Sequence, residues 1–215
     1  GINTRKIGSA TDSADLRRLV LRCFNSYLRS TINAHDPRTA YYLLHQYRLL
    51  GEHLLSCGDV ASITEIATNF QFYGLLGYEN GQGFLLEVAA HDLVELIRMS
   101  IDSGGAQVSS LLDCLLEMDR RFRDEMQEQS LAGVRREQLI AAAMLVQGGY
   151  ESEMERVLTD LRQEDPARLL RIFNRLMTEE REQYWEFTDR GTNFEYLRPE
   201  LRTHLESVIG RLGLR

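Results

Sequence analysis

The chain alternates between stretches with helical apolar spacing and short polar breaks that contain Gly, Pro, Asn or Asp. After Pro37, for example, apolar residues recur every three or four positions up to Leu54, which is the period of an amphipathic helix. No stretch shows the two-residue alternation between turns that indicates a strand. The pattern predicts an all-α protein with about nine helices, at about residues 13–32, 37–56, 59–75, 83–101, 105–128, 133–147, 151–162, 166–187 and 199–212.

Proline and glycine mark the predicted helix ends. Asp36-Pro37 and Asp165-Pro166 each combine a side chain that accepts hydrogen bonds from free amides with a residue that has no N–H to satisfy. The stretch GLLGYENGQG, residues 74–83, is predicted to end the third helix, because four glycines disfavour helical backbone. The stretch SLAG, residues 130–133, is predicted to separate the fifth and sixth helices.

Short breaks between helices predict antiparallel neighbours, so the expected architecture is an antiparallel helical bundle or a stack of helical hairpins. A chain of 215 residues suffices for one buried core. We therefore predict a single domain over residues 1–215, with sub-bundles 10–130 and 131–215 as a further division. Residues 141–166 are similar to half of a tetratricopeptide-type hairpin, but no second copy follows at a fixed period.

Composition excludes some classes of function. The chain is 43% hydrophobic and 27% charged, as globular proteins are, and its net charge of −7 argues against nucleic-acid binding. The three cysteines are widely spaced and form no CxxC pair, which favours a reducing compartment. No apolar run reaches the ~18 residues of a membrane span, so the chain as given is not predicted to cross a bilayer.

One helix carries a spacing that suggests metal ligands. Glu87, His91 and Glu95 form an E-x3-H-x3-E series along one side of the predicted helix 83–101. The same pattern is typical of a solvated helix face, and no Glu-x-x-His spacing on another helix offers further ligands. We therefore predict no cofactor and no metal, and a metal-binding protein or enzyme centred on these three residues is the second alternative.

Nucleophilic chemistry has little support in the sequence. No nucleophile elbow or catalytic cysteine signature occurs, so no catalytic residue is predicted and enzymatic activity stays an open question. Cys57 lies near a predicted helix end, and we assign no histidine or basic cluster to its neighbourhood that would activate the thiol. His45 and His53 are predicted to be partly exposed residues of the second helix.

The break between the first two helices holds the candidate contact residues. Asn33 is predicted to end the first helix in a left-handed conformation, while Asp36 and Thr39 begin the second. His35 and Arg38 have no role in helix capping, so they are either exposed loop residues or contacts to a partner. The predicted partner or ligand contacts are thus Asn33, His35, Asp36, Arg38 and Thr39.

The same break resembles a motif of a family of uncharacterised bacterial integral-membrane proteins, whose signature reads Ser-Pro-x-Ile-Asn-Asp-Pro-x-Thr-Ala. In an alignment without gaps, Asp36, Pro37, Thr39 and Ala40 match the signature, and Thr31 replaces its serine. Three residues depart from it: Ile32 replaces the proline, Ala34 the isoleucine and His35 the asparagine. The resemblance covers residues 14–55, with a similar layout up to about residue 130.

This resemblance implies a soluble cytoplasmic regulatory or assembly domain of a larger integral membrane protein. The membrane helices of that larger protein would precede Gly1, and the domain would lie on the cytoplasmic side of the inner membrane. The positive charges of Arg5 and Lys6 agree with that orientation. The implied partner is another protein or its own transmembrane region, with a homo-oligomer as an alternative and no nucleic acid. The first alternative function is a free-standing cytoplasmic scaffold built of helical repeats.

Overall fold

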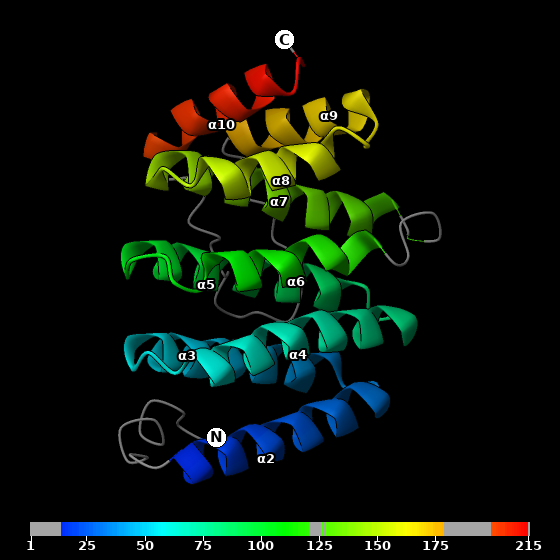
Figure 1. Ribbon diagram of the computed structural model, residues 1–215. Helices are drawn as coiled ribbons and strands as arrows, with labels where there is room; N and C mark the ends of the chain where they lie inside the picture. The colour runs from blue at the N-terminus through cyan, green and yellow to red at the C-terminus, as the bar shows by residue number, and fades with distance from the viewer. Residues whose placement is uncertain (1–13, 121–125, 127, 179–198, 215) are drawn as a thin grey trace. The chain divides into compact units, whose positions relative to one another are not determined.

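The computed structural model describes residues 14–120, 126, 128–178 and 199–214. Within this part of the chain the fold is all-α, as predicted, with nine helices and no strand (Figure 1). The helices are α2 (Ala14–Asn33), α3 (Pro37–Ser56), α4 (Val60–Glu79), α5 (Phe84–Asp102), α6 (Val108–Arg120), α7 (Glu128–Gly148), α8 (Glu151–Leu161), α9 (Pro166–Met177) and α10 (Pro199–Arg211).

The chain divides into two compact units, Gly1–Ser130 and Leu131–Arg215, which are described separately. In the first unit each helix packs against the next helix and against the one after it, from α2 to α6. Such contacts define two layers, with α2, α4 and α6 in one and α3 and α5 in the other. This unit is therefore a stack of helical hairpins, one of the two predicted architectures. In the second unit, α9 packs against α10.

The predicted aspartate caps are confirmed at two helix starts. The Oδ1 atom of Asp36 accepts a hydrogen bond from the Thr39 N–H at 3.1 Å, and that of Asp165 accepts one from the Ala167 N–H at 3.0 Å. Asp59 caps α4 in the same way through the Ser62 N–H at 3.2 Å. Caps of this kind stabilise a helical protein by about 1 kcal/mol each.

The predicted end of the third helix is wrong, because α4 continues through Gly74 and Gly77 to Glu79. Both glycines are buried where α4 and α5 approach closely. A Cβ atom at Gly77 would lie 2.7 Å from the Cβ of Leu85, closer than packed atoms tolerate. Packing against α5 thus offsets the roughly 1 kcal/mol that each glycine costs a helix.

The boundaries of two other predicted helices also change. The SLAG stretch lies inside α7, where Leu131 and Gly133 are buried, so tertiary packing again overrides the weak helix propensity of glycine. The predicted helix 166–187 is observed as α9 up to Met177, and its part beyond residue 178 lies outside the described residues.

Polar side chains tie the layers of the first unit together. Asn69 donates a hydrogen bond to the Tyr47 hydroxyl at 2.7 Å, and the Tyr73 hydroxyl donates to the Asn25 carbonyl at 2.9 Å. The buried Gln82 amide donates to the Ile32 carbonyl at 2.9 Å. The first of these bonds joins α3 to α4, and the other two anchor α2, including its C-terminal end, to α4 and the loop that follows it.

Candidate functional site

The turn between α2 and α3 is built around His35. Its backbone is left-handed, with φ 55°, and it is the sole non-glycine residue with positive φ in the described part of the chain. The His35 N–H donates to the Ile32 carbonyl at 3.0 Å, and the Asp36 N–H donates to the Thr31 carbonyl at 3.2 Å. This hydrogen-bond pair is a Schellman motif, in which the left-handed residue follows the helix. The prediction that Asn33 is left-handed is therefore wrong, because Asn33 is still helical.

The predicted contact residues lie together at this turn. Asn33, His35, Asp36 and Arg38 are exposed, and Thr39 is half-buried. Hydrogen bonds from the side chain and backbone N–H of Thr39 lower the pKa of Asp36, so its carboxylate is engaged in capping. The capping role of Asp36 is thereby confirmed. A role of these residues in partner contact stays a prediction.

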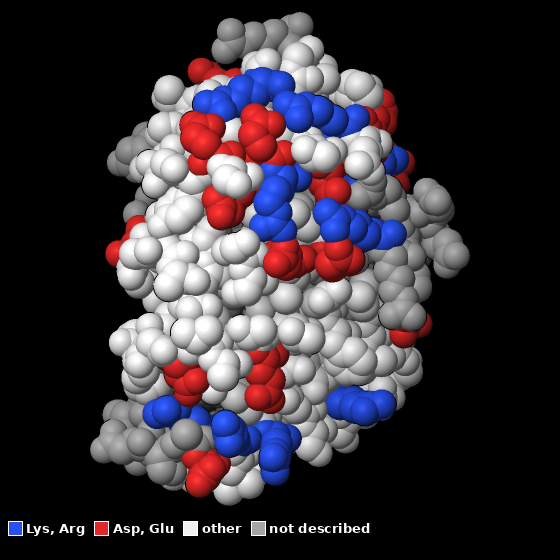
Figure 2. All heavy atoms as spheres, in the orientation of Figure 1, with Lys and Arg blue, Asp and Glu red and all other residues white. Residues whose placement is uncertain are grey.

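The outward side of α2 exposes apolar and basic side chains together. Leu16, Leu19 and Tyr27 retain 42%, 55% and 54% of their accessible surface. Figure 2 shows a row of blue basic side chains at the bottom of the view, where Figure 1 places α2. We use the name α2 face for the exposed residues Leu16, Arg18, Leu19, Arg22, Cys23, Tyr27 and Arg29.

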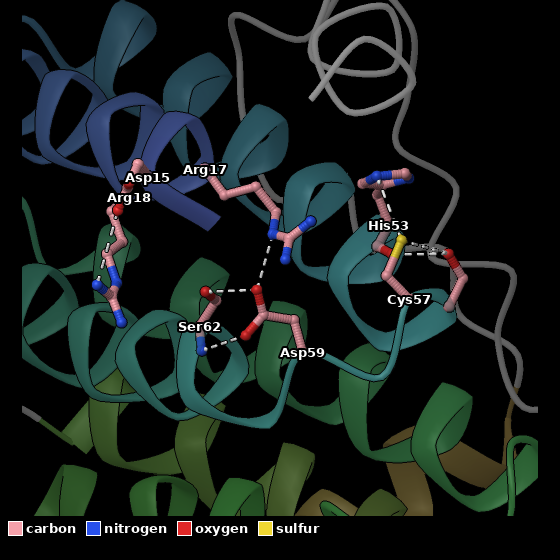
Figure 3. Close-up of polar contacts among 8 residues, drawn as sticks. Asp15, Arg17, Arg18, His53, Cys57, Asp59 and Ser62 are labelled. Atoms are coloured by element: carbon pink, nitrogen blue, oxygen red, sulfur yellow. Dashed lines mark hydrogen bonds and ion pairs between the residues drawn. The ribbon is translucent and has the colours of Figure 1, made fainter. Parts of the chain in front are cut away.

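The charge of α2 differs in sign from that of the whole chain. Four arginines and one aspartate give the helix +3, whereas the chain carries −7. Of the four arginines, Arg17 is turned inward and pairs with Asp59 at 2.8 Å (Figure 3). Arg29 lies over the Phe72 ring, with 5.9 Å between the guanidinium carbon and the ring centroid. The basic charge of this helix is therefore displayed on the α2 face.

The E-x3-H-x3-E series on α5 does not form a solvated face. Glu87 is buried and His91 and Glu95 are half-buried, because α5 packs against α3, α4 and α6. Glu95 is paired with Arg98, with Oε2 at 2.9 Å from Nη2. Among the described residues, no group of three or more His, Cys, Asp and Glu side chains is placed to hold a metal ion.

A charge cluster between α3 and α5, buried at Asp92 and half-buried at its other members, was not predicted. The Arg48 Nε atom lies 3.2 Å from Asp92 Oδ1, and Arg48 also pairs with Glu52. The second oxygen of Asp92 is buried without a hydrogen-bond partner among the described residues. Burial raises the pKa of Asp92 to about 7, although Arg48 opposes the shift. Burial, with the positive charge of Arg48, lowers the pKa of His45 to about 4.

A thiol and an imidazole meet at the end of α3 (Figure 3). Cys57 Sγ lies 3.5 Å from His53 Nε2, and the hydrogen bond between these two atoms is exposed to solvent. Ser56 Oγ donates to the His53 carbonyl at 2.6 Å and lies 4.0 Å from Cys57 Sγ. The expectation that no histidine lies beside Cys57 is wrong. The signal was present in the sequence, because residues four apart on a helix lie on the same side.

The second unit contains a buried ion network. Arg135 is fully buried, with Nε at 2.9 Å from Glu164 Oε2 and Nη1 donating to Gln138 at 2.6 Å. Arg168 pairs with the other oxygen of Glu164 at 2.5 Å. Because Glu164 lies between α8 and α9, this network links α7 to α9 within the unit. Because the charged side chains of this network pair with one another, the network fits a structural role.

No family model, curated protein or solved structure matches this chain. The resemblance of residues 30–40 to the integral-membrane protein family therefore stays a prediction. None of the helices within residues 14–120, 128–178 and 199–214 has the length and apolarity of a membrane span.

Proposed function

We propose that this chain is a protein-interaction module that serves as a cytoplasmic regulatory or assembly domain of an integral membrane protein. The observation that carries the interaction role is the α2 face. Single exposed apolar residues are common on protein surfaces. Here Leu16, Leu19 and Tyr27 are exposed on one helix beside three exposed arginines. Aromatic residues and arginine are the residue types enriched at protein interfaces.

The partner that fits this face is an acidic amphipathic helix of another protein. Its apolar side would cover Leu16, Leu19 and Tyr27, and its carboxylates would meet Arg18 and Arg22. A second copy of α2 fits less well, because each copy brings a charge of +3. His35 lies in the turn after α2 and Arg38 in the first turn of α3, so we propose that they extend the contact.

The link to a membrane protein rests on the family resemblance of residues 30–40. A free-standing helical scaffold is the second candidate function, and the two-layer stack of α2 to α6 favours it, since such stacks expose extended binding surfaces. Both candidates use the α2 face. They differ in whether the product of the complete gene is held in a membrane.

Site-specific crosslinking tests the interaction role. A photo-crosslinking amino acid at Leu19 is compared with the same group at Thr159, an exposed position of α8. The expected result is one discrete protein adduct from Leu19 and none from Thr159 in cells that express the complete gene. The double charge reversal Arg18→Glu with Arg22→Glu should lower the yield strongly. Adducts to lipid alone, adducts to a second copy alone, or no adduct would each contradict the proposal.

A further inference from the structure

The three cysteines have different surroundings. Cys57 Sγ is within hydrogen-bond distance of His53 Nε2, at 3.5 Å. Cys23 is exposed on the α2 face, with no histidine partner among the described residues. Cys114 is half-buried, and burial raises the pKa of its thiol. The chain therefore combines one thiol beside a base with an exposed thiol that provides an internal reference.

The backbone holds the thiol and the imidazole in register. The Cys57 N–H donates to the His53 carbonyl at 3.1 Å, which is the last turn of α3, and the Ser56 hydroxyl donates to the same carbonyl. Side chains four apart on a helix lie on one side, so the ring and the sulfur remain adjacent. Cys57 and the next residue, Gly58, are both exposed, so a small molecule can reach the thiol.

We propose that Cys57 is a nucleophilic thiol that exchanges with small-molecule disulfides, with His53 as its general base. His53 Nε2 accepts the thiol proton while Sγ attacks one sulfur of the disulfide. A new sulfur–sulfur bond forms, the original one breaks, and the departing thiolate takes the proton from the imidazole. Cys57 is oxidised to a mixed disulfide, half of the small disulfide is reduced to a thiol, and no further oxidant is needed.

The rates of modification at Cys57 and Cys23 test this in one molecule. The purified chain is treated with iodoacetamide, and in a parallel experiment with oxidised glutathione, and each cysteine is followed by peptide mass spectrometry. At neutral pH, Cys57 should react on the order of ten-fold faster than Cys23, a modest factor for a positioned base because the pair is exposed. Cys57 should also form the mixed disulfide first.

One variant removes the base and a second serves as its control. His53→Gln keeps a polar side chain but cannot accept the proton, so the Cys57 rate should fall to about that of Cys23. Thr159→Ala, at an exposed position of α8, should leave the Cys57 rate unchanged, because the Thr159 hydroxyl is bonded to the Glu155 carbonyl of its own helix. Equal rates at Cys57 and Cys23 in the wild type, or an unchanged Cys57 rate in a folded His53→Gln variant, would overturn the proposal. The purified chain contains no partner, so the result is independent of whether the α2 face binds one.

Discussion

At the scale of single residues, His35 is the backbone position with the clearest strain. Left-handed backbone costs an L-residue roughly 1–2 kcal/mol relative to the right-handed form. Asn, Asp and His are the non-glycine types that occur there most often. His35 therefore belongs to the small group of residue types that tolerate this turn. Comparable helix ends use glycine, at Gly58, Gly81, Gly104, Gly149 and Gly213.

His35→Gly should therefore stabilise the protein. We expect the free energy of unfolding to rise by about 0.5–1 kcal/mol, since relief of strain exceeds the extra chain entropy of glycine. Urea denaturation followed by circular dichroism measures this change. His35→Ala is the matched control, because it keeps a Cβ at positive φ, and it should not stabilise. A less stable glycine variant would show that the imidazole, which contacts the Asn33 carbonyl at 3.1 Å, contributes more than the strain costs.

At the scale of helices, the sequence predicts what is local and misses what depends on packing. The caps at Asp36 and Asp165 were predictable, because the residues that make them are two or three positions apart. The continuation of α4 through Gly74 and Gly77 was not, because it depends on Leu85 and other residues of α5. The same distinction holds for the sites. The His53–Cys57 spacing is visible in the sequence, whereas the partners Arg48 and Asp92 lie on different helices.

The close approach of α4 and α5 can be tested at Gly77. Gly77→Ala should lower the free energy of unfolding by about 1–3 kcal/mol, because the new methyl overlaps the Cβ and Cδ1 of Leu85. Gly51→Ala is the matched control within α3, where the methyl would meet the end of the Leu96 side chain at 3.1 Å and Ile66 Cγ2 at 3.5 Å. The gain in helix propensity of about 1 kcal/mol is the same at both positions. The loss at Gly51 should be smaller, because the end of the Leu96 side chain can move, whereas the Cβ of Leu85 is fixed to the backbone. Thermal unfolding of both variants shows which one loses more stability. A stabilising Gly77→Ala would contradict the close contact between α4 and α5.

The charge cluster between α3 and α5 should make stability depend on pH. Asp92 has a pKa of about 7 in the folded chain against a usual 3.8, so its contribution to stability rises as the pH falls from about 7 towards 4. His45 has a folded pKa of about 4 against a usual 6.5, so its contribution falls as the pH drops from about 6.5 towards 4. The two contributions oppose each other, and that of His45 is reduced by partial exposure of the ring to solvent.

Removing His45 or Asp92 by mutation should reveal how the other group makes the free energy of unfolding depend on pH. Relative to the wild type, His45→Gln should gain stability more steeply as the pH is lowered from about 6.5 to 4.5, by less than about 1 kcal/mol per pH unit because solvent screens the half-exposed ring. Asp92→Asn should instead lose stability relative to the wild type over the same range. Urea denaturation at several pH values measures both slopes. Parallel curves for the three proteins would show that neither group is shifted as the cluster implies.

At the scale of the whole molecule, charge is unevenly distributed. The chain carries −7, yet α2 carries +3, and the exposed arginines of the α2 face display that charge. An acidic partner would be attracted to this helix and repelled by the remainder of the molecule, which favours one docking position over others. Exposed charges are screened within about 10 Å at 0.1 M salt. The adduct formed at Leu19 in cell lysate should therefore diminish as NaCl is raised, while adducts due to apolar contact alone would persist.

The membrane link is tested on the product of the complete gene. Membranes from cells that express it are washed with carbonate and with high salt, and the protein is detected by an antibody against this chain. If the domain belongs to an integral membrane protein, it should remain in the membrane until detergent is added, because only buried apolar spans resist both washes.

Release by salt alone would indicate attachment through the basic α2 face, and a freely soluble product of ~25 kDa would favour the scaffold. Charge reversal at Arg18 and Arg22 separates the first two cases: it should abolish salt-sensitive attachment and leave an integral membrane protein in place.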